Sequence, residues 1–98
     1  MKYRLEVRDE ASAEFIESYL WYEGQREGLG EEFHDEVQEY FHTLRQRPTG
    51  FPKWRGPFKK INLKRFPYVI VFRVMKDAVI IYSVFHSKRN PSRWGERR

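Results

Sequence analysis

The chain has 98 residues, of which 40% are hydrophobic and 17% aromatic, and its formal net charge is +5. This length suits a single domain over residues 1–98, because domains typically run to about 100–150 residues. The absence of cysteine excludes disulfides, thiolate metal sites and a catalytic thiol. No apolar run approaches the roughly 18 residues of a membrane span, and the charged N-terminal residues are unlike a signal peptide. We therefore expect a small cytoplasmic domain with no membrane partner.

The charge is divided unevenly along the chain. Residues 1–47 contain twelve acidic and six basic residues, for a net charge of −6. Residues 48–98 contain two acidic and thirteen basic residues, for a net charge of +11. The two halves could simply neutralise each other as solvated surface. Because the basic residues are interleaved with aromatic ones, we interpret the second half instead as a basic binding face.

A strand and a helix are predicted first. Residues 2–8 alternate apolar and charged side chains, which indicates a half-exposed strand. From about residue 10 to 25 the periodicity is helical. The predicted apolar face of this helix contains Ala11, Phe15, Tyr19 and Tyr22, joined by Ile16 and Leu20. Its opposite face carries three carboxylates, Glu10, Glu14 and Glu17, which we expect to be solvated.

A second helix follows after a short break. Gly28-Leu29-Gly30 is expected to end the first helix, and apolar residues at helical spacing predict the second from about residue 31 to 46. The apolar residues of the second helix are Phe33, Val37, Tyr40, Phe41 and Leu44. So short a break predicts an antiparallel helical hairpin.

The remaining pattern is that of strands. Pro48-Thr49-Gly50-Phe51-Pro52 ends the helices, and strands are predicted at 58–65, 68–75 and 78–85. The element order predicts an α+β domain. It would have an N-terminal strand, an antiparallel two-helix hairpin on one face of the sheet, and a three-stranded antiparallel meander. Residues 90–98 are predicted to form a basic C-terminal tail.

The register of the last hairpin predicts which side chains share a face. A two-residue turn at Lys76-Asp77 places Arg73 opposite Ile80. Uninterrupted alternation then places Arg73, Tyr82 and His86 on one face. The other face is more uniformly apolar, so we expect the helices to cover it and these three side chains to lie on the open side.

The three histidines differ in what they predict. His34 and His42 lie eight residues apart, about 80° away from a common helical face, and make no ligand pair. With no cysteine to join them, we predict no metal site. His86 ends a buried strand just before several cations. It is either a general base suited to phosphate chemistry or a cap of the strand, and the sequence leaves both interpretations open.

Lysines crowd the first predicted strand of the meander. Alternation puts Lys60, Asn62 and Lys64 on one face, where a row of cations would match a phosphate backbone or an acidic protein surface. The alternative is an edge strand kept soluble by its lysines. The candidate residues for binding a target or nucleic acid are Lys60, Lys64, Arg73, Lys88, Arg89 and Trp94.

Taken in order, several short motifs resemble the RelE/ParE superfamily of toxins from bacterial type II toxin–antitoxin systems. The motifs are Gly28-Leu29-Gly30 with Phe33, Phe51-Pro52, Arg65-Phe66-Pro67-Tyr68, and the ending from Val84 to Pro91 followed by Trp94. The resemblance covers essentially the whole chain. It implies a helical hairpin on an antiparallel sheet, a role in growth inhibition and plasmid stabilisation, and a cognate antitoxin with which the toxin forms a hetero-oligomer.

The resemblance also bears on the activity, because RelE-like members cleave messenger RNA on the ribosome. Of the side chains they use, the first of two strand lysines is kept, at Lys60, whereas the second falls on Asn62. An arginine after the strand tyrosine falls on Val69. A later arginine falls near Lys88, and the terminal tyrosine falls near Trp94. Most of the RelE-type set is therefore missing.

The Gly-Leu-Gly and Arg-Phe-Pro-Tyr motifs are more similar to the ParE branch, whose members poison DNA gyrase by binding. The resemblance thus implies a gyrase inhibitor that uses no cofactor and is not an enzyme. One alternative is a ribosome-dependent mRNA endonuclease, with His86 as base and Arg73 or Arg89 stabilising the charge of the transition state. Another is a non-toxic basic module that binds nucleic acid.

Overall fold

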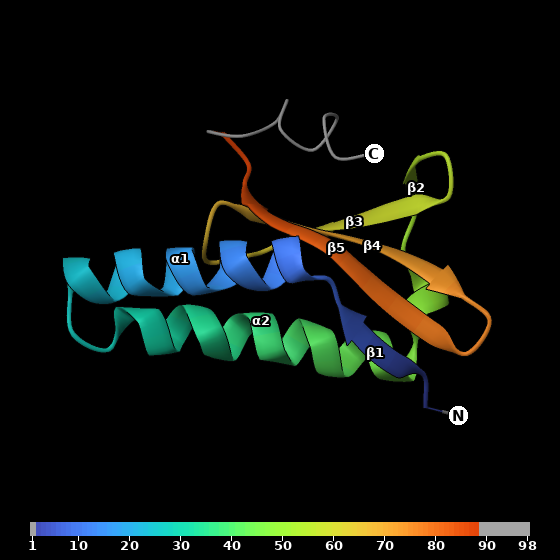
Figure 1. The fold of residues 1–98 in the computed structure, drawn as a ribbon, viewed down its shortest axis with the longest axis horizontal. Coiled ribbons are helices and arrows are strands. Elements are labelled where there is room, and N and C mark those ends of the chain that lie inside the picture. Colours follow the sequence, from blue (N-terminus) through green and yellow to red (C-terminus); the bar gives the residue numbers. More distant parts are fainter. Residues whose placement is uncertain (1, 89–98) are drawn as a thin grey trace.

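A helical hairpin lies along one face of a five-stranded sheet (Figure 1). The computed structural model describes residues 2–88. The elements are β1 (Arg4–Val7), α1 (Asp9–Gln25), α2 (Leu29–Gln46), a 3₁₀ turn (Pro48–Gly50), β2 (Lys53–Arg55), β3 (Phe58–Asn62), β4 (Tyr68–Met75) and β5 (Ala78–His86). The strand order is β1-β5-β4-β3-β2, with β1 parallel to β5 and the other neighbours antiparallel. The predicted α+β fold is confirmed.

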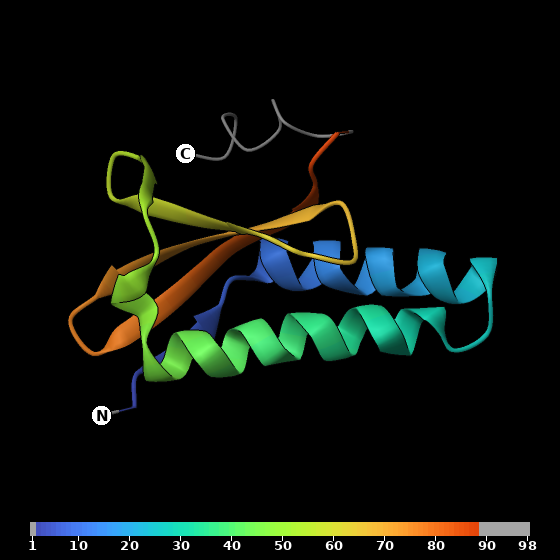
Figure 2. The ribbon, with the colours of Figure 1, turned by 180° about the vertical axis from the view of Figure 1, so that it is seen from behind.

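Two strands enter the sheet in ways that the sequence pattern did not predict. The short strand β2 pairs with β3, so the meander has a fourth antiparallel strand. Only three residues long, β2 offers too little alternation to be detected. Strand β1 lies at the other edge and pairs in parallel with the first half of β5. Seen from behind, the two helices again run side by side along the same side of the strands (Figure 2).

The turn between the helices is tighter than predicted. Helix α2 begins at Leu29, so that only Gly28 of the predicted break lies outside it, with φ 89°. The carboxylate of Glu23 accepts the backbone N–H groups of Gly28 and Gly30, each at 2.9 Å. A carboxylate from α1 therefore caps the N-terminus of α2, where unpaired N–H groups and the helix dipole favour negative charge. The predicted antiparallel hairpin is confirmed.

The main core lies between α2 and the sheet. Helix α2 buries an apolar stripe, whereas α1 buries only Ala11 and Tyr22. The buried stripe of α2 consists of Phe33, Val37, Phe41 and Leu44. Ile16 and Leu20 are 56% and 61% exposed, so the prediction that they join the apolar face of α1 is wrong. Helix α1 is apolar on more than one side, and it meets the sheet mainly at β5.

A bulge in β5 changes the predicted register. Arg73 pairs with Ile80 as predicted, and Phe72 pairs with Ile81. Val71, however, pairs with Ser83, so that Tyr82 is an extra residue in β5. Beyond the bulge the alternation is inverted. His86 consequently pairs with Tyr68 on the helix-covered face, and the prediction that it shares a face with Arg73 is wrong.

Glu14 closes the edge of β5 where β1 no longer reaches it. The last backbone bond across this edge runs from the Arg8 N–H to the Ile81 carbonyl, at 3.0 Å. Beyond it, Glu14 Oε1 accepts the Ser83 hydroxyl at 2.9 Å and the Val84 N–H at 3.0 Å. The prediction that Glu14 is a solvated residue on the outer face of its helix is therefore wrong. Among the described residues, no helix is long and apolar enough to cross a membrane.

Candidate binding face

The sheet face turned away from the helices, here called the open face, combines an apolar centre with cations. Its buried centre consists of Val69, Val71 and Phe85, and Trp54, Phe58 and Tyr82 pack around it. Strand pairing places Lys60 opposite Val71, and Arg73 lies two residues further along β4 on the same face. Lys60 and Arg73 are thus diagonal neighbours, a relation that places two residues about 7–8 Å apart, with their Cβ atoms somewhat closer.

Aromatic rings hold several of these cations in place. The Arg55 guanidinium lies 4.5 Å from the centroid of the Trp54 ring, and Lys60 Nζ lies 5.1 Å from it. The Arg8 guanidinium, between β1 and α1, lies 5.1 Å from the centroid of the Tyr82 ring on β5. A cation over a ring face gains about 0.5–1 kcal/mol at exposed sites. The rings therefore reduce the freedom of the cations without neutralising their charge.

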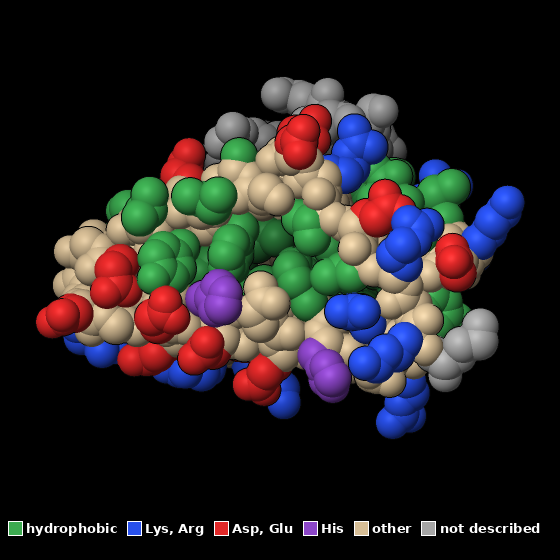
Figure 3. All heavy atoms as spheres, turned by 60° about the horizontal axis from the view of Figure 1, so that its bottom comes forward, with side chains coloured by type: hydrophobic (Ala, Val, Ile, Leu, Met, Phe, Trp, Pro, Cys, Tyr) green, Lys and Arg blue, Asp and Glu red, His purple; other side chains and the backbone are tan. Residues whose placement is uncertain are grey.

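The two central cations of the open face, Lys60 and Arg73, have no acidic partner among the described residues, whereas Arg8 at its border lies 3.6 Å from Glu10. Arg26 and Arg65 both pair with Glu32, on the helical side of the molecule. Among residues 2–88, by contrast, no carboxylate lies within ion-pair distance of Lys60 or Arg73. Figure 3 looks onto the helical side and shows acidic side chains gathered over the hairpin. The open face thus carries positive charge that is free to attract an acidic partner.

The sequence analysis missed two residues that border this face, Arg8 and Arg55. Arg8 is one of the charged residues of the alternating segment 2–8, and Arg55 lies in the unpredicted strand β2. A usable signal was present at Arg55, because it follows Trp54 directly and basic residues next to aromatic ones favour cation–π contacts.

His86 is not part of the open face. Its ring packs edge-on against Tyr68, with the centroids 5.3 Å apart. Its Nδ1 accepts the backbone N–H of Lys88 at 3.1 Å, so the imidazole caps the turn after β5. Of the two interpretations left open by the sequence, the geometry supports the cap. The structure does not bring His86 and Arg73 together.

Lys64 also leaves the predicted row of cations, because β3 ends at Asn62. The backbone N–H groups of Lys64 and Arg65 donate to Glu36 Oε2, at 2.8 and 3.2 Å. Lys64 lines a hollow of about 420 Å³ beside α2, on the helical side. The prediction that it shares a face with Lys60 is wrong, because the loop after β3 turns toward α2.

The last candidates lie at the end of the described chain. Lys88 is exposed in the turn that follows β5. Arg89 and Trp94, like the predicted basic tail, lie outside the described residues. The structure therefore assembles Lys60 and Arg73 on one surface, adds Arg8 and Arg55 to it, and separates them from Lys64 and His86.

Solved structures of bacterial toxins share this fold. The first is titled "Chromosomal ParDE TA system from P. aeruginosa", with a TM-score of 0.78 and 19% identity over 89% of this chain and 98% of that chain. The second is a double arginine-to-alanine mutant of E. coli RelE in the free state, with a TM-score of 0.70 and 22% identity over 93% of this chain and 90% of that chain. The third is the isolated E. coli RelE toxin, with a TM-score of 0.66 and 22% identity over 97% of this chain and 94% of that chain. These three likenesses show that the chain has the fold of these toxins.

The amino-acid sequence shows which family the chain belongs to. Residues 5–91 match the family described as "ParE toxin of type II toxin-antitoxin system, parDE". The chain therefore belongs to the ParE toxin family of type II toxin–antitoxin systems, and the resemblance noted from its motifs is confirmed. No curated protein sequence matches the chain significantly.

Proposed function

We propose that this toxin inhibits DNA gyrase by binding it through the open face, and that a cognate antitoxin neutralises it. The observation that carries the proposal is the match of residues 5–91 to the ParE family. The basic open face supports it, because Lys60 and Arg73 have no carboxylate within ion-pair distance among residues 2–88. Both the target and the antitoxin would be met in the cytoplasm. The antitoxin would form a hetero-oligomer with the toxin.

The placement of His86 supports binding rather than cleavage. A nuclease that used His86 as base and Arg73 as anion stabiliser would need both groups within reach of one phosphate. The bulge at Tyr82 instead puts them on opposite sheet faces, and Nδ1 of His86 is engaged with the Lys88 N–H. A surface that attracts and orients an acidic partner requires neither group to move a proton.

The two cations that have no acidic partner in the described part of the chain indicate the chemistry of the binding partner. Lys60 and Arg73 would form ion pairs with a gyrase surface, and an acidic antitoxin segment would compete for the same positions. Such charges steer association and select partners. This competition would explain how one face can both carry toxicity and be neutralised.

A supercoiling assay with purified toxin and gyrase tests the proposal. We expect inhibition by the unaltered chain, and a half-inhibitory concentration at least about tenfold higher for Lys60→Glu/Arg73→Glu, since each lost charge contact is worth around 1 kcal/mol. The matched control is Lys64→Glu, which reverses a charge on the helical side and should inhibit normally. Unimpaired supercoiling at saturating toxin would overturn the proposal.

A second candidate is ribosome-dependent cleavage of messenger RNA. Two of the similar folds are RelE toxins, and the Lys60–Arg73 diagonal could contact neighbouring phosphates. Induced expression with separate readouts of DNA damage and transcript cleavage distinguishes the two. If the toxin cleaves transcripts and His86→Ala abolishes this cleavage, the proposed function would change from gyrase inhibition to catalytic cleavage of messenger RNA. Harmless expression with salt-dependent binding to bare DNA or RNA would instead identify a non-toxic nucleic-acid-binding module.

A further inference from the structure

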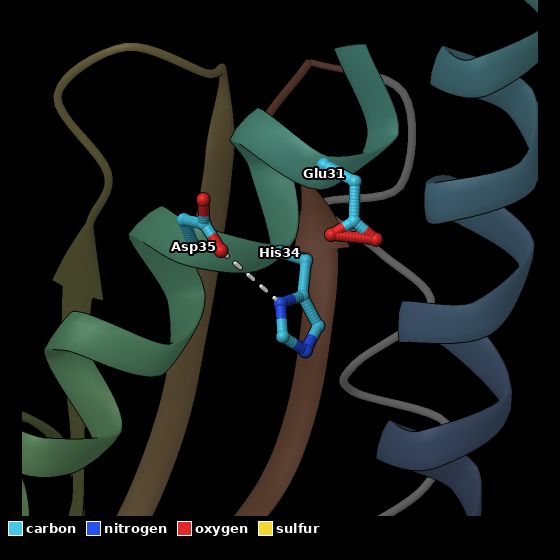
Figure 4. Close-up of side chains that lie close together, drawn as sticks. All are labelled: Glu31, His34 and Asp35. Atoms are coloured by element: carbon cyan, nitrogen blue, oxygen red, sulfur yellow. Dashed lines mark hydrogen bonds and ion pairs between the residues drawn. The ribbon is translucent and has the colours of Figure 1, made fainter. Parts of the chain in front are cut away.

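One turn of α2, on the helical side of the molecule, carries an imidazole beside two carboxylates (Figure 4). The residues are Glu31, His34 and Asp35. Each offers one ligand atom, and these atoms all lie within 4.8 Å of one another. The spacing i, i+3, i+4 is what brings three side chains to the same stretch of a helix surface. No other group of three such residues in the part of the chain that the structure describes meets this criterion.

The imidazole of His34 is held by its neighbours but keeps nitrogen atoms available. Its ring lies 5.6 Å from the Phe15 ring and edge-on to Tyr19 at 6.4 Å, measured between centroids. Nδ1 is 3.5 Å from Asp35 Oδ1, too long for a good hydrogen bond. No hydrogen bond to Nε2 is present among residues 2–88. The rings of α1 thus limit the orientation of His34 while the side chain stays 40% exposed to solvent.

The carboxylate of Glu31 is oriented by a contact from the other helix. The Tyr19 hydroxyl donates to Glu31 Oε1 at 2.8 Å, and within the described chain Glu31 Oε2 has no hydrogen-bond partner. Metal-binding carboxylates and histidines are commonly held by an outer layer of hydrogen bonds in this way. The turn therefore combines one oriented carboxylate, one oriented imidazole and a second carboxylate that is exposed.

We propose that Glu31, His34 and Asp35 bind a divalent transition metal ion of the zinc type. One imidazole nitrogen and two carboxylate oxygens form a donor set suited to Zn²⁺, whereas Mg²⁺ and Ca²⁺ prefer oxygen donors alone. Bond lengths of about 2.0–2.2 Å require the ligand atoms to approach more closely than 4.8 Å. Closing this difference requires side-chain rotation, for which Glu31 and Asp35 are exposed.

The imidazole distinguishes this turn from the other acidic stretches of α2. Glu32, Glu36 and Glu39 have partners or neighbours of their own, but no histidine lies with two of them at ligand distance in the described structure. His42 lines a hollow with Asp35, Gln38, Glu39 and Thr43 but belongs to no such group of three in the described structure, and it therefore serves as a matched control. The site lies away from the open face and does not depend on the proposed function.

Calorimetric titration of the untagged, full-length toxin with ZnCl₂ tests this proposal. We expect one Zn²⁺ per chain, unaffected by millimolar Mg²⁺, and a melting temperature that rises with added Zn²⁺. His34→Ala should weaken binding by about tenfold or more, the scale seen when metal-site support is lost. His42→Ala should bind like the unaltered chain.

Two further variants separate ligands from neighbours. Asp35→Asn and Glu31→Gln should each weaken binding, and Glu27→Gln, an exposed change in the preceding turn, should not. Circular dichroism would verify that every variant is folded. An absence of binding, or equal weakening by His34→Ala and His42→Ala, would overturn the proposal.

Discussion

Glu14 shows how a single side chain can substitute for a missing strand. Strand β1 covers β5 only as far as Ile81, and the exposed edge beyond it would leave the Val84 N–H unpaired. A carboxylate that accepts both this N–H and the Ser83 hydroxyl satisfies two buried donors beside the bulge. Because buried polar groups need partners, Glu14 also stabilises the register that separates His86 from Arg73.

We therefore predict that Glu14→Ala lowers the free energy of unfolding by about 2 kcal/mol, since an unsatisfied buried donor costs about 1–3 kcal/mol. Glu17→Ala, on the exposed side of the same helix, should change it by less than about 0.5 kcal/mol. Urea denaturation at pH 7 measures both. Equal effects of the two substitutions would show that the carboxylate does not support the bulge.

At the scale of single residues, the sequence predicted which residues are candidates for binding better than it predicted which residues they contact. Lys60 and Arg73 were both predicted to bind a target, and strand pairing puts them on one face. His34 was predicted to make no ligand pair because of its spacing from His42. Glu31 and Asp35, at helical spacing from His34, are a signal in the sequence for the cluster that the structure shows. Partners such as Glu14 and Val84, 70 residues apart, become adjacent only through the fold.

The helical hairpin depends on close contact at Gly30. A Cβ atom at this position would lie 2.7 Å from the Tyr19 carbonyl oxygen and 2.8 Å from Glu23 Oε1. The first of these atoms is backbone and cannot move without separating the helices. The second belongs to the carboxylate that caps α2. Any side chain at this position therefore disturbs both the packing and the cap.

We predict that Gly30→Ala lowers the free energy of unfolding by about 1–3 kcal/mol, the usual cost of overpacking. Gly24→Ala is the matched control, because nothing lies within 4 Å of a Cβ atom there. It should raise stability by about 0.5 kcal/mol, since alanine favours the helix over glycine. Thermal and urea unfolding would measure the pair, and a stabilised Gly30→Ala variant would refute the tight contact.

Glu32 connects the hairpin to the loop after β3, and this connection should depend on pH. The Arg65 guanidinium, and next that of Arg26, hold the pKa of the Glu32 carboxyl below its usual value. A carboxyl whose pKa is depressed by folding stabilises the protein above its unfolded pKa of about 4.3. This contribution is lost as the pH falls through the lower pKa of the folded state.

We predict that Glu32→Gln lowers the urea midpoint at pH 7, and that the difference from the unaltered chain disappears at acid pH. The effect should be modest and should shrink in high salt, because the pair is exposed. Glu27→Gln, a neighbouring exposed carboxylate without a described ion pair, should follow the unaltered chain at every pH. A Glu32→Gln difference that persists at acid pH would exclude this linkage.

The elements themselves were predictable where the pattern is long and its boundaries are marked. Strand β4 has the predicted bounds and β5 extends one residue further, because two apolar runs flank the Lys76-Asp77 turn. The bulge at Tyr82 was not predictable, since alternation assumes one residue opposite each partner. That single extra residue is the reason why the face predicted for His86 was wrong.

At the scale of the whole molecule, the uneven charge of the sequence becomes a separation between two sides. Most acids lie on the hairpin, where Glu32 pairs with Arg26 and Arg65. Lys60 and Arg73, at the centre of the open face, have no such ion pair among the described residues. The small net charge of +5 therefore understates the field that a partner of the open face would meet.

This separation predicts that position, rather than net charge, governs binding to a polyanion. Lys60→Glu/Arg73→Glu and Arg47→Glu/Lys64→Glu each lower the net charge from +5 by four, to about +1 by the charge-counting rule. The first pair lies on the open face; in the second, Arg47 follows α2 and Lys64 lines the hollow beside it. On immobilised heparin, the open-face variant should elute at clearly lower salt, because each lost contact reduces the salt dependence by about one released counterion. Equal elution of the two charge-matched variants would mean that the open face has no special affinity for anions, and the polarity of the molecule would then be without consequence for binding.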